Sequence, residues 1–265
     1  MHIADALLSS HIAVPMCIVS GAVLALSAAR AVKDGSAEAR LPLMAAGGAF
    51  IFAAQMINFA IPGTGASGHI TGGVLLAAML GGNLSVICIA AVLAIQALFF
   101  ADGGILALGC NIFNMGILPC LVVYPLFFKP FTKNAAASGR IFAAALLSCI
   151  LALQAGAFAA VLEITLSGAA AIPFRTFALL MQPIHLAIGI AEGVITGAVL
   201  RFVYRSRPEI LDCLTPDTQK PTSSRGVALI FSAAAVAALL LSVFASRCPD
   251  GLEWSLEKIS ELGSL

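Results

Sequence analysis

The sequence predicts an all-α fold: a polytopic helical membrane protein with about seven core segments and one further C-terminal transmembrane helix. Of the 265 residues, 60% are hydrophobic and only 10% are charged, whereas about 25% are charged in an ordinary soluble domain. Apolar stretches of near-helical length follow one another along the chain, and most basic residues fall between them. This composition excludes a soluble core, and neither end of the chain is basic enough to indicate binding to nucleic acid.

The apolar segments are Ile12–Ala31, Leu41–Ile61, Gly68–Leu80, Leu84–Phe100, Ile105–Phe128, Ile141–Ile164, Pro173–Val203 and Val227–Ala245. The third segment is short, because a helix rises about 1.5 Å per residue and must cross a hydrocarbon layer of roughly 30 Å. We expect it to be tilted, buried in protein or extended by its flanking loops. Its irregular ends indicate a cavity.

Basic residues favour one side of the membrane. Eleven of the 14 Lys and Arg residues fall in three loops that share a side if the segments alternate: Arg30, Lys33 and Arg40; Lys129, Lys133 and Arg140; Arg201, Arg205, Arg207, Lys220 and Arg225. The positive-inside rule makes that side cytoplasmic, so both chain ends are expected outside the cell membrane. The N-terminus lacks the features of a cleaved signal peptide, so Met1 is expected to remain.

The loop from Asn58 to Gly73 is polar but carries no charged side chain. Its glycines allow tight backbone turns, Pro62 is expected to end the preceding helix, and His69 stands where the next apolar run begins. The spacing of Gly63 and Gly68 matches a phosphate-binding loop, but the Lys and Ser or Thr that follow in such loops are absent. The loop either presents His69 as a ligand or is only a tight turn between helices.

The N-terminal sequence Met1-His2-Ile3 suits metal chelation. The free amine of Met1, the deprotonated amide of His2 and the His2 imidazole can bind one metal in nearly one plane, and His69 is the natural fourth ligand. Four planar nitrogens suit Ni(II) or Cu(II), and imidazole also suits cobalt. A histidine at the second position can be incidental, but the predicted topology puts both imidazoles on one face and favours a metal site.

Other polar residues are candidates for supporting roles. Asp102 and Asn111 either tie loops over the metal or cap helices, and Asn58 and Ser67 are expected near His69 in the same loop. His185 and Glu192 are seven residues apart on one helical face; they are functional groups or, as we favour, a hydrogen-bonded structural pair. The scattered cysteines form no Cys-x-x-Cys pair and indicate small core residues.

Several of these motifs together resemble the CbiM/NikM family, the cobalt and nickel capture (S) components of energy-coupling-factor transporters. The motifs are Met1-His2-Ile3, Ser67-Gly68-His69 with Gly72-Gly73, the run from Gln96 to Gly104, and Asn111-Ile112-Phe113-Asn114. The resemblance implies Ni²⁺ or Co²⁺ as the transported substrate, held by Met1, His2 and His69. This sequence departs from the family in Ala6 and in a loop one residue longer than a commoner form, which affects the fine geometry.

The resemblance also implies partners: a transmembrane coupling (T) subunit and two cytoplasmic ATPases, with the chain itself not an enzyme. A stand-alone metal carrier or channel is the alternative; a metalloprotease would need His-Glu-x-x-His, which the four histidines do not form. We expect three parts: 1–211, a metal-capture transmembrane domain; 212–226, a cytoplasmic linker; and 227–265, an accessory transmembrane helix whose tail is similar to a PDGLE-type module. The tail lacks histidine and is not expected to join the metal site.

Overall fold

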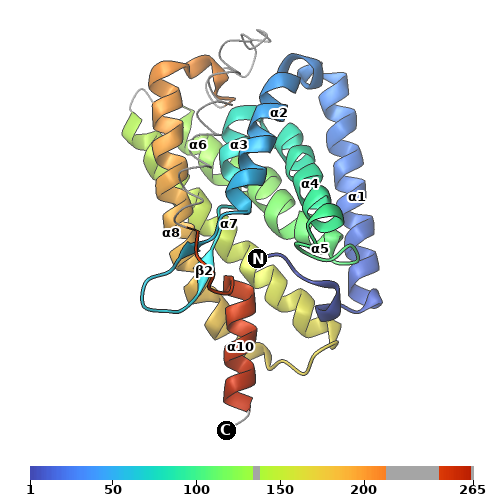
Figure 1. Cartoon of the computed structure of the whole chain (residues 1–265). Coiled ribbons are helices and arrows are strands. Elements are labelled where there is room, and N and C mark those ends of the chain that lie inside the picture. Colours follow the sequence, from blue (N-terminus) through green and yellow to red (C-terminus); the bar gives the residue numbers. More distant parts are fainter. Residues whose placement is uncertain (134–137, 213–244, 264–265) are drawn as a thin grey trace.

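The computed structural model describes residues 1–133, 138–212 and 245–263. These residues form a bundle of helices roughly parallel to one long axis (Figure 1). The helices are α1 (Ser10–Lys33), α2 (Ser36–Gln55), α3 (Gly73–Leu80), α4 (Gly82–Phe99), α5 (Leu108–Ile112), η2 (Phe113–Phe128), α6 (Lys129–Thr132), α7 (Ser138–Ser167), α8 (Phe174–Ser206) and α10 (Gly251–Gly263), with short turns η1 (Asp5–Leu7) and η3 (Pro208–Ile210). The predicted all-α membrane fold is confirmed.

In the described part of the chain, six helices are long and apolar enough to cross a membrane. They are α1, α2, α4, α7, α8 and the continuous rod of α5, η2 and α6 from Leu108 to Thr132. The predicted short third segment corresponds to α3, in which every residue is buried. Because α3 lies inside protein, its main chain has no need to reach both membrane surfaces.

Glycines allow the close packing of the buried helices. A Cβ at Gly73 in α3 would lie 2.6 Å from Cγ of Pro119 in η2. On α8, Gly189, Gly193 and Gly197 stand at intervals of four against α7, where Cβ atoms would lie 2.6 to 3.1 Å from α7 atoms. Such small-residue stripes let membrane helices approach closely. These glycines let α8 pack closely against α7. The neighbouring face of α8, which carries Glu192, faces the loop before α3.

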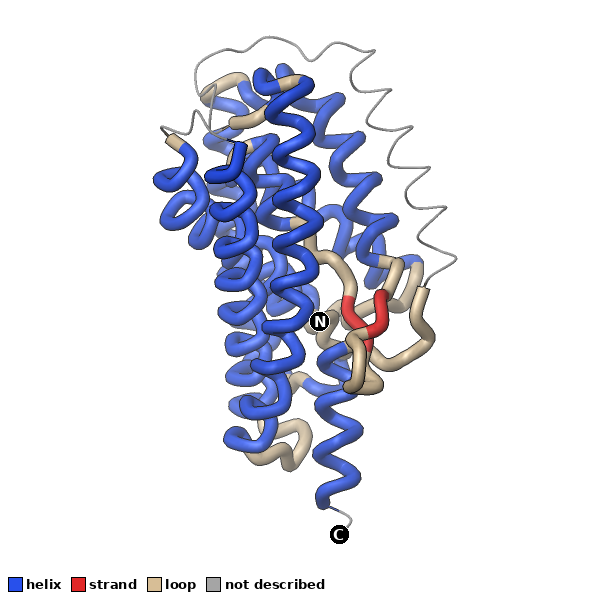
Figure 2. The backbone as a smooth tube through the Cα atoms, turned by 90° about the vertical axis from the view of Figure 1, so that its left-hand side faces the viewer, coloured by secondary structure: helices blue, strands red, loops and turns tan. Residues whose placement is uncertain are grey.

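Two predicted helix limits are wrong. The helix α2 ends at Gln55 rather than at Ile61, and α3 begins at Gly73 rather than at Gly68. The intervening chain instead forms two short antiparallel strands, β1 (Phe59–Ala60) and β2 (Ser67–Gly68), which cross beside the N-terminus in Figure 2. The apolar pattern continues through this region, but its main-chain groups bond between the strands, to the C-terminal tail and to the Glu192 carboxylate instead of forming a helical ladder.

The C-terminal tail, residues 245–263, packs on these strands. Ser246 N donates to Asn58 O (2.7 Å), Ser67 N donates to Pro249 O (2.8 Å), and α10 then runs away from the bundle (Figure 1). Trp254 Nε1 donates to Thr64 O at 3.0 Å, in the turn between the strands. The predicted linker and the segment Val227–Ala245 lie outside the described residues, except for Asp212 and Ala245 at their edges.

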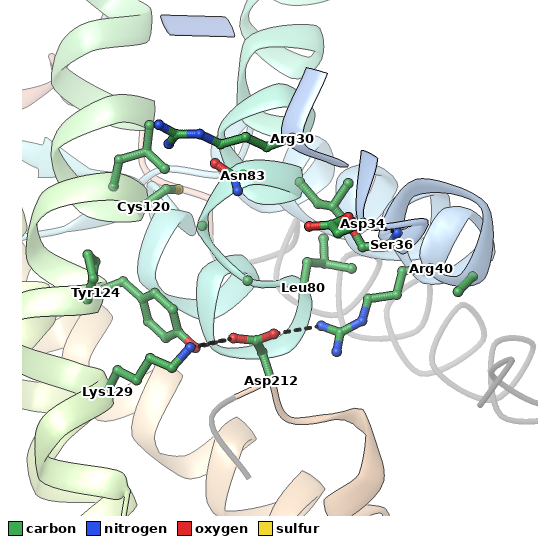
Figure 3. A pocket seen from close by; sticks show the side chains of 16 residues that line it. Arg30, Asp34, Ser36, Arg40, Leu80, Asn83, Cys120, Tyr124, Lys129 and Asp212 are labelled. Atoms are coloured by element: carbon green, nitrogen blue, oxygen red, sulfur yellow. Dashed lines mark hydrogen bonds and ion pairs between the residues drawn. The ribbon is translucent and has the colours of Figure 1, made fainter. Parts of the chain in front are cut away.

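The end of the bundle that carries the predicted basic loops contains a cavity of about 520 Å³ (Figure 3). Asp212 stands at its rim, 3.1 Å from Arg40 Nη1 and 3.6 Å from Lys129 Nζ, and it accepts a 2.8 Å hydrogen bond from Tyr124 Oη. Its main-chain N donates to Ala78 O at 2.9 Å. Asp212 thus ties α2, α3, η2 and α6 together at this end, which we call the basic end.

Candidate metal centre

The N-terminal segment lies inside the bundle, and Met1 is only 4% exposed. Asn111 in α5 holds the main chain of Ile3 from both sides: its Oδ1 accepts from Ile3 N (2.8 Å) and its Nδ2 donates to Ile3 O (3.1 Å). Gly104 N also donates to Ile3 O at 2.9 Å. A side chain at Gly104 would overlap Asp5, so a glycine is required where this loop meets the N-terminal segment.

The amine of Met1 contacts two side chains that are distant in the sequence. It lies 3.0 Å from His69 Nε2 and donates to Asp250 Oδ2 at 2.8 Å. The other ring nitrogen of His69, Nδ1, lies 3.4 Å from Ile70 O. Donation from Nδ1 to this carbonyl leaves the lone pair of Nε2 directed at the amine, which is the arrangement a metal ligand needs.

The ring of His2 stacks against the ring of His69, with centroids 5.0 Å apart and an interplanar angle of 26°. His2 Nε2 lies 3.2 Å from Gln96 Oε1, and His2 Nδ1 lies 3.3 Å from Asp102 Oδ1. The amine and both imidazoles therefore meet in one place, as the sequence predicted. Gln96 was not predicted as part of this site.

Both imidazoles are held neutral at neutral pH. Burial, and then the positive charge of the amine, lower the pKa of His2 from its ordinary 6.5 to about 4. The same two causes, with a contribution from His2, lower the pKa of His69 well below 6.5. For Asp250, burial alone raises the pKa, but the charge and hydrogen bond of the amine outweigh it and lower the pKa below its usual range. Neutral imidazoles offer lone pairs to a metal without first losing a proton.

Glu192 fixes the chain that follows His69. Its carboxylate accepts hydrogen bonds from Thr71 N (2.8 Å), Thr71 Oγ1 (2.8 Å) and Gly72 N (3.0 Å). Gly72 has φ +76°, and a Cβ there would overlap the side chain of Ile51. The predicted structural pair of Glu192 with His185 is therefore wrong: Glu192 binds the metal loop instead, and His185 Nδ1 bonds to Met181 O at 2.8 Å.

His185 lies nearer the candidate centre than the sequence indicated. Its Nε2 has no hydrogen-bond partner among the described residues. It lines a cavity of about 10 Å³ together with Met1, His69 and Asp250. A Cβ at Gly251 would lie 3.0 Å from His185 Cε1, so this glycine lets the start of α10 dock directly on α8.

The four predicted supporting residues divide into two pairs. Asp102 and Asn111 contact His2 and Ile3, as described above. Ser67 holds the tail, since its Oγ donates to Cys248 O at 2.7 Å, and the main-chain oxygen of Asn58 accepts from the tail at Ser246. Asn58 and Ser67 thus bind the segment that covers the site.

The expectation that the tail stays apart from the site is wrong, because Asp250 bonds to the Met1 amine. Sequence reasoning missed Asp250 because its local pattern is that of a helix cap: Oδ1 accepts from Leu252 N and Glu253 N, both at 2.9 Å. No local signal revealed that its second oxygen, Oδ2, faces residue 1.

The centre depends on main-chain nitrogen. Within residues 1–133, 138–212 and 245–263, no three His, Cys, Asp or Glu side chains gather as a metal-binding group. The terminal amine lies beside the two imidazoles, so main-chain nitrogen is present there in addition to the side chains. The arrangement suits a divalent transition metal that accepts planar nitrogen ligands.

Comparison with known proteins identifies relatives of this chain. Residues 2–210 match the family model CbiM, described as the cobalt uptake substrate-specific transmembrane region. The chain is 36% identical to a provisionally named metal transport protein of Haloquadratum walsbyi, over 80% of this chain and 93% of that protein. It is also 36% identical to a provisionally named fused nickel transport protein, NikMN, of Archaeoglobus fulgidus, over 80% of this chain and 68% of the relative.

A crystal structure of a truncated transition metal transporter superposes with a TM-score of 0.67 and 30% identity, covering 77% of this chain and 99% of that one. The family model covers residues 2–210, which include α1 to α8. The chain therefore belongs to the CbiM family of cobalt uptake substrate-specific transmembrane regions.

Proposed function

We propose that this chain is the substrate-specific capture component of an ATP-driven energy-coupling-factor importer for Ni²⁺ or Co²⁺. The observation that carries the proposal is the meeting of the Met1 amine with His69 Nε2 at 3.0 Å, beside the stacked ring of His2. The metal binds to the amine of Met1, the deprotonated amide and imidazole of His2, and the imidazole of His69. Four such nitrogens in one plane match the preference of Ni(II), and imidazole also serves cobalt.

The basic end and the metal centre lie at different places along the bundle, which supports a site that faces outward. Arg40 and Lys129 lie at the basic end with Asp212, whereas Met1 lies beside the first turn of α10 (Figure 1). By the positive-inside rule the basic end is cytoplasmic, and the N-terminus then faces the outside of the cell membrane. Metal arriving from outside therefore reaches the end of the bundle that carries His2 and His69 before it reaches the basic end.

Transport requires energy that this chain is not proposed to supply. We assign ATP hydrolysis to two separate cytoplasmic ATPases and their coupling to a transmembrane T subunit. The chain selects the ion through the geometry of its nitrogen ligands, and the partners drive the conformational change that releases it inward.

Reconstitution in vesicles tests the proposal. We expect the purified chain to bind one Ni²⁺ or Co²⁺ per molecule, and to import the ion only when the T subunit, both ATPases and ATP are present. Uptake by the chain alone, without ATP, would instead indicate a stand-alone carrier or channel. Absence of stoichiometric binding by the folded native chain would contradict a capture role altogether.

A further inference from the structure

Among the described residues, Asp250 in the tail is the carboxylate that contacts the terminal amine. Asp250 Oδ2 lies 2.8 Å from Met1 N, across 249 residues of sequence, and the two side chains are 14% and 3% exposed. The other carboxylate at the centre, Asp102, contacts His2 Nδ1 at 3.3 Å and is 32% exposed. Solvent screens Asp102 more than Asp250, so Asp250 exerts the stronger field at the amine.

The position of Asp250 is fixed from several sides. Its Oδ1 caps the start of α10, Ser67 N bonds to Pro249 O, and Trp254 Nε1 bonds to Thr64 O. Gly251 presses against α8 at Ile184 and His185. These contacts fix the position of the Asp250 carboxylate, which is therefore not a mobile surface charge.

The proposed metal complex has a net positive charge that the Asp250 carboxylate can balance. A divalent cation bound to one deprotonated amide and three neutral nitrogens carries one net positive charge. Burying an uncompensated charge is costly. One carboxylate beside the amine makes the buried group neutral.

We infer that Asp250 is a positioning residue for the transported metal: it accepts a hydrogen bond from the metal-bound Met1 amine and balances the charge of the complex. This inference rests on the proposed function of the Met1, His2 and His69 site. An amine bound to a metal keeps two N–H groups, and one of them continues to donate to Oδ2. The bond directs the nitrogen lone pair toward the metal, as a carboxylate does for a metal-bound histidine. The tail thereby completes a site whose nitrogen ligands all lie in the first domain.

The conservative variant Asp250→Asn separates this role from helix capping. Asparagine keeps an oxygen that caps α10 about as well as aspartate does, but it removes the negative charge and turns an N–H donor toward the amine. We expect the Kd for Ni²⁺ to rise about 10- to 100-fold, the range seen for residues that orient metal ligands. Asp250→Ala, which also loses the cap, should weaken binding at least as much. Glu257→Gln, an exposed change on the same helix, is the matched control and should leave the Kd unchanged.

The ligand-field absorption of bound Ni²⁺ provides a second measurement. At saturating metal, Asp250→Asn should reproduce the native spectrum, because the four nitrogen ligands are retained. A Kd for Asp250→Asn equal to the native value, or lower, would overturn the inference, and so would a changed spectrum, which would make Asp250 a direct ligand.

The same titrations distinguish this inference from the proposed function. If the native chain binds metal, His69→Ala abolishes binding and Asp250→Asn changes nothing, only the role of Asp250 is wrong. If the native chain binds no metal, or His69→Ala binds like the native chain, the proposed function fails.

Discussion

The two ends of the bundle differ in how their polar groups are packed. At the metal centre, the cavity beside Met1, His69 and Asp250 is about 10 Å³, close to the volume one water molecule needs. At the basic end, the cavity is about 520 Å³ and is lined by Arg30, Arg40 and Lys129 with two aspartates. The cavity at the metal centre is too small for a hydrated cation. In the cavity at the basic end, the surplus of cationic side chains disfavours a cation.

The two ends of the bundle thus differ in the kind of polar group that they contain. At the basic end, the charged pairs of Asp212 with Arg40 and Lys129 hold helices together. The metal centre contains neutral imidazoles, a main-chain amine and one covering carboxylate. The tail and the strand loop pack over the centre, so the proposed binding of an ion from outside would require these segments to move.

The largest expected effect is the loss of a ligand at the centre. We expect His69→Ala to raise the Kd for Ni²⁺ about 1,000-fold, or about 4 kcal/mol, because one of four ligands is removed. The exposed imidazole of His11 is the control, and His11→Ala should bind like the native chain. Asp212→Asn at the other end should also leave the Kd within twofold. Calorimetric titration of the native chain and the three variants measures these affinities. Equal affinities for His69→Ala and His11→Ala would contradict the assignment of His69 as a metal ligand.

Acid should destabilise the metal centre of the metal-free protein. The pKa of His2 is about 4 when folded and 6.5 otherwise, so as pH falls from 6.5 to 4 the unfolded state binds a proton that the folded state does not. The folded state then loses about 3 kcal/mol, at 1.36 kcal/mol per pKa unit. Thermal unfolding in detergent across this range measures the loss. His2→Ala should reduce the slope in this window and leave the part that His69 causes; an unchanged slope would show that His2 is not a cause.

At the basic end, removal of the Asp212 charge should affect stability and not metal binding. Asp212→Asn leaves Arg40 and Lys129 without their shared carboxylate, and since these groups are partly exposed the cost is about 2 kcal/mol. Glu38→Gln, an exposed change on α2, should stay within about 0.5 kcal/mol. A shift in unfolding temperature for Asp212→Asn no larger than that for Glu38→Gln would contradict the assigned structural role.

A smaller effect on metal affinity is expected for Glu192→Gln. The amide cannot accept all three bonds from Thr71 and Gly72, so the loop that presents His69 loosens and the Kd rises about tenfold. Glu163→Gln is the control, because Glu163 is also buried but bonds to Asn114 at 2.7 Å and not to this loop. If both variants raised the Kd equally, Glu192 would act only through general stability.

The sequence predicted what depends on local pattern. The membrane segments follow from apolar runs, and Met1, His2 and His69 follow from chelate spacing and from the side of the membrane on which each is expected. Asp250 could not be predicted, because its nearest neighbours explain it fully as a helix cap. Glu192 was assigned to the wrong partner because helical spacing relates it to His185, whereas the loop that it binds is 120 residues away.

The free N-terminus is the central claim, and one added residue tests it most directly. An alanine placed before Met1 moves the amine away from His69 and Asp250 and makes His2 the third residue, which changes the size of the chelate. Ni²⁺ titration of this variant, with its folding checked by helical circular dichroism, should show loss of tight one-to-one binding. Binding as tight as that of the native chain would contradict the proposed site.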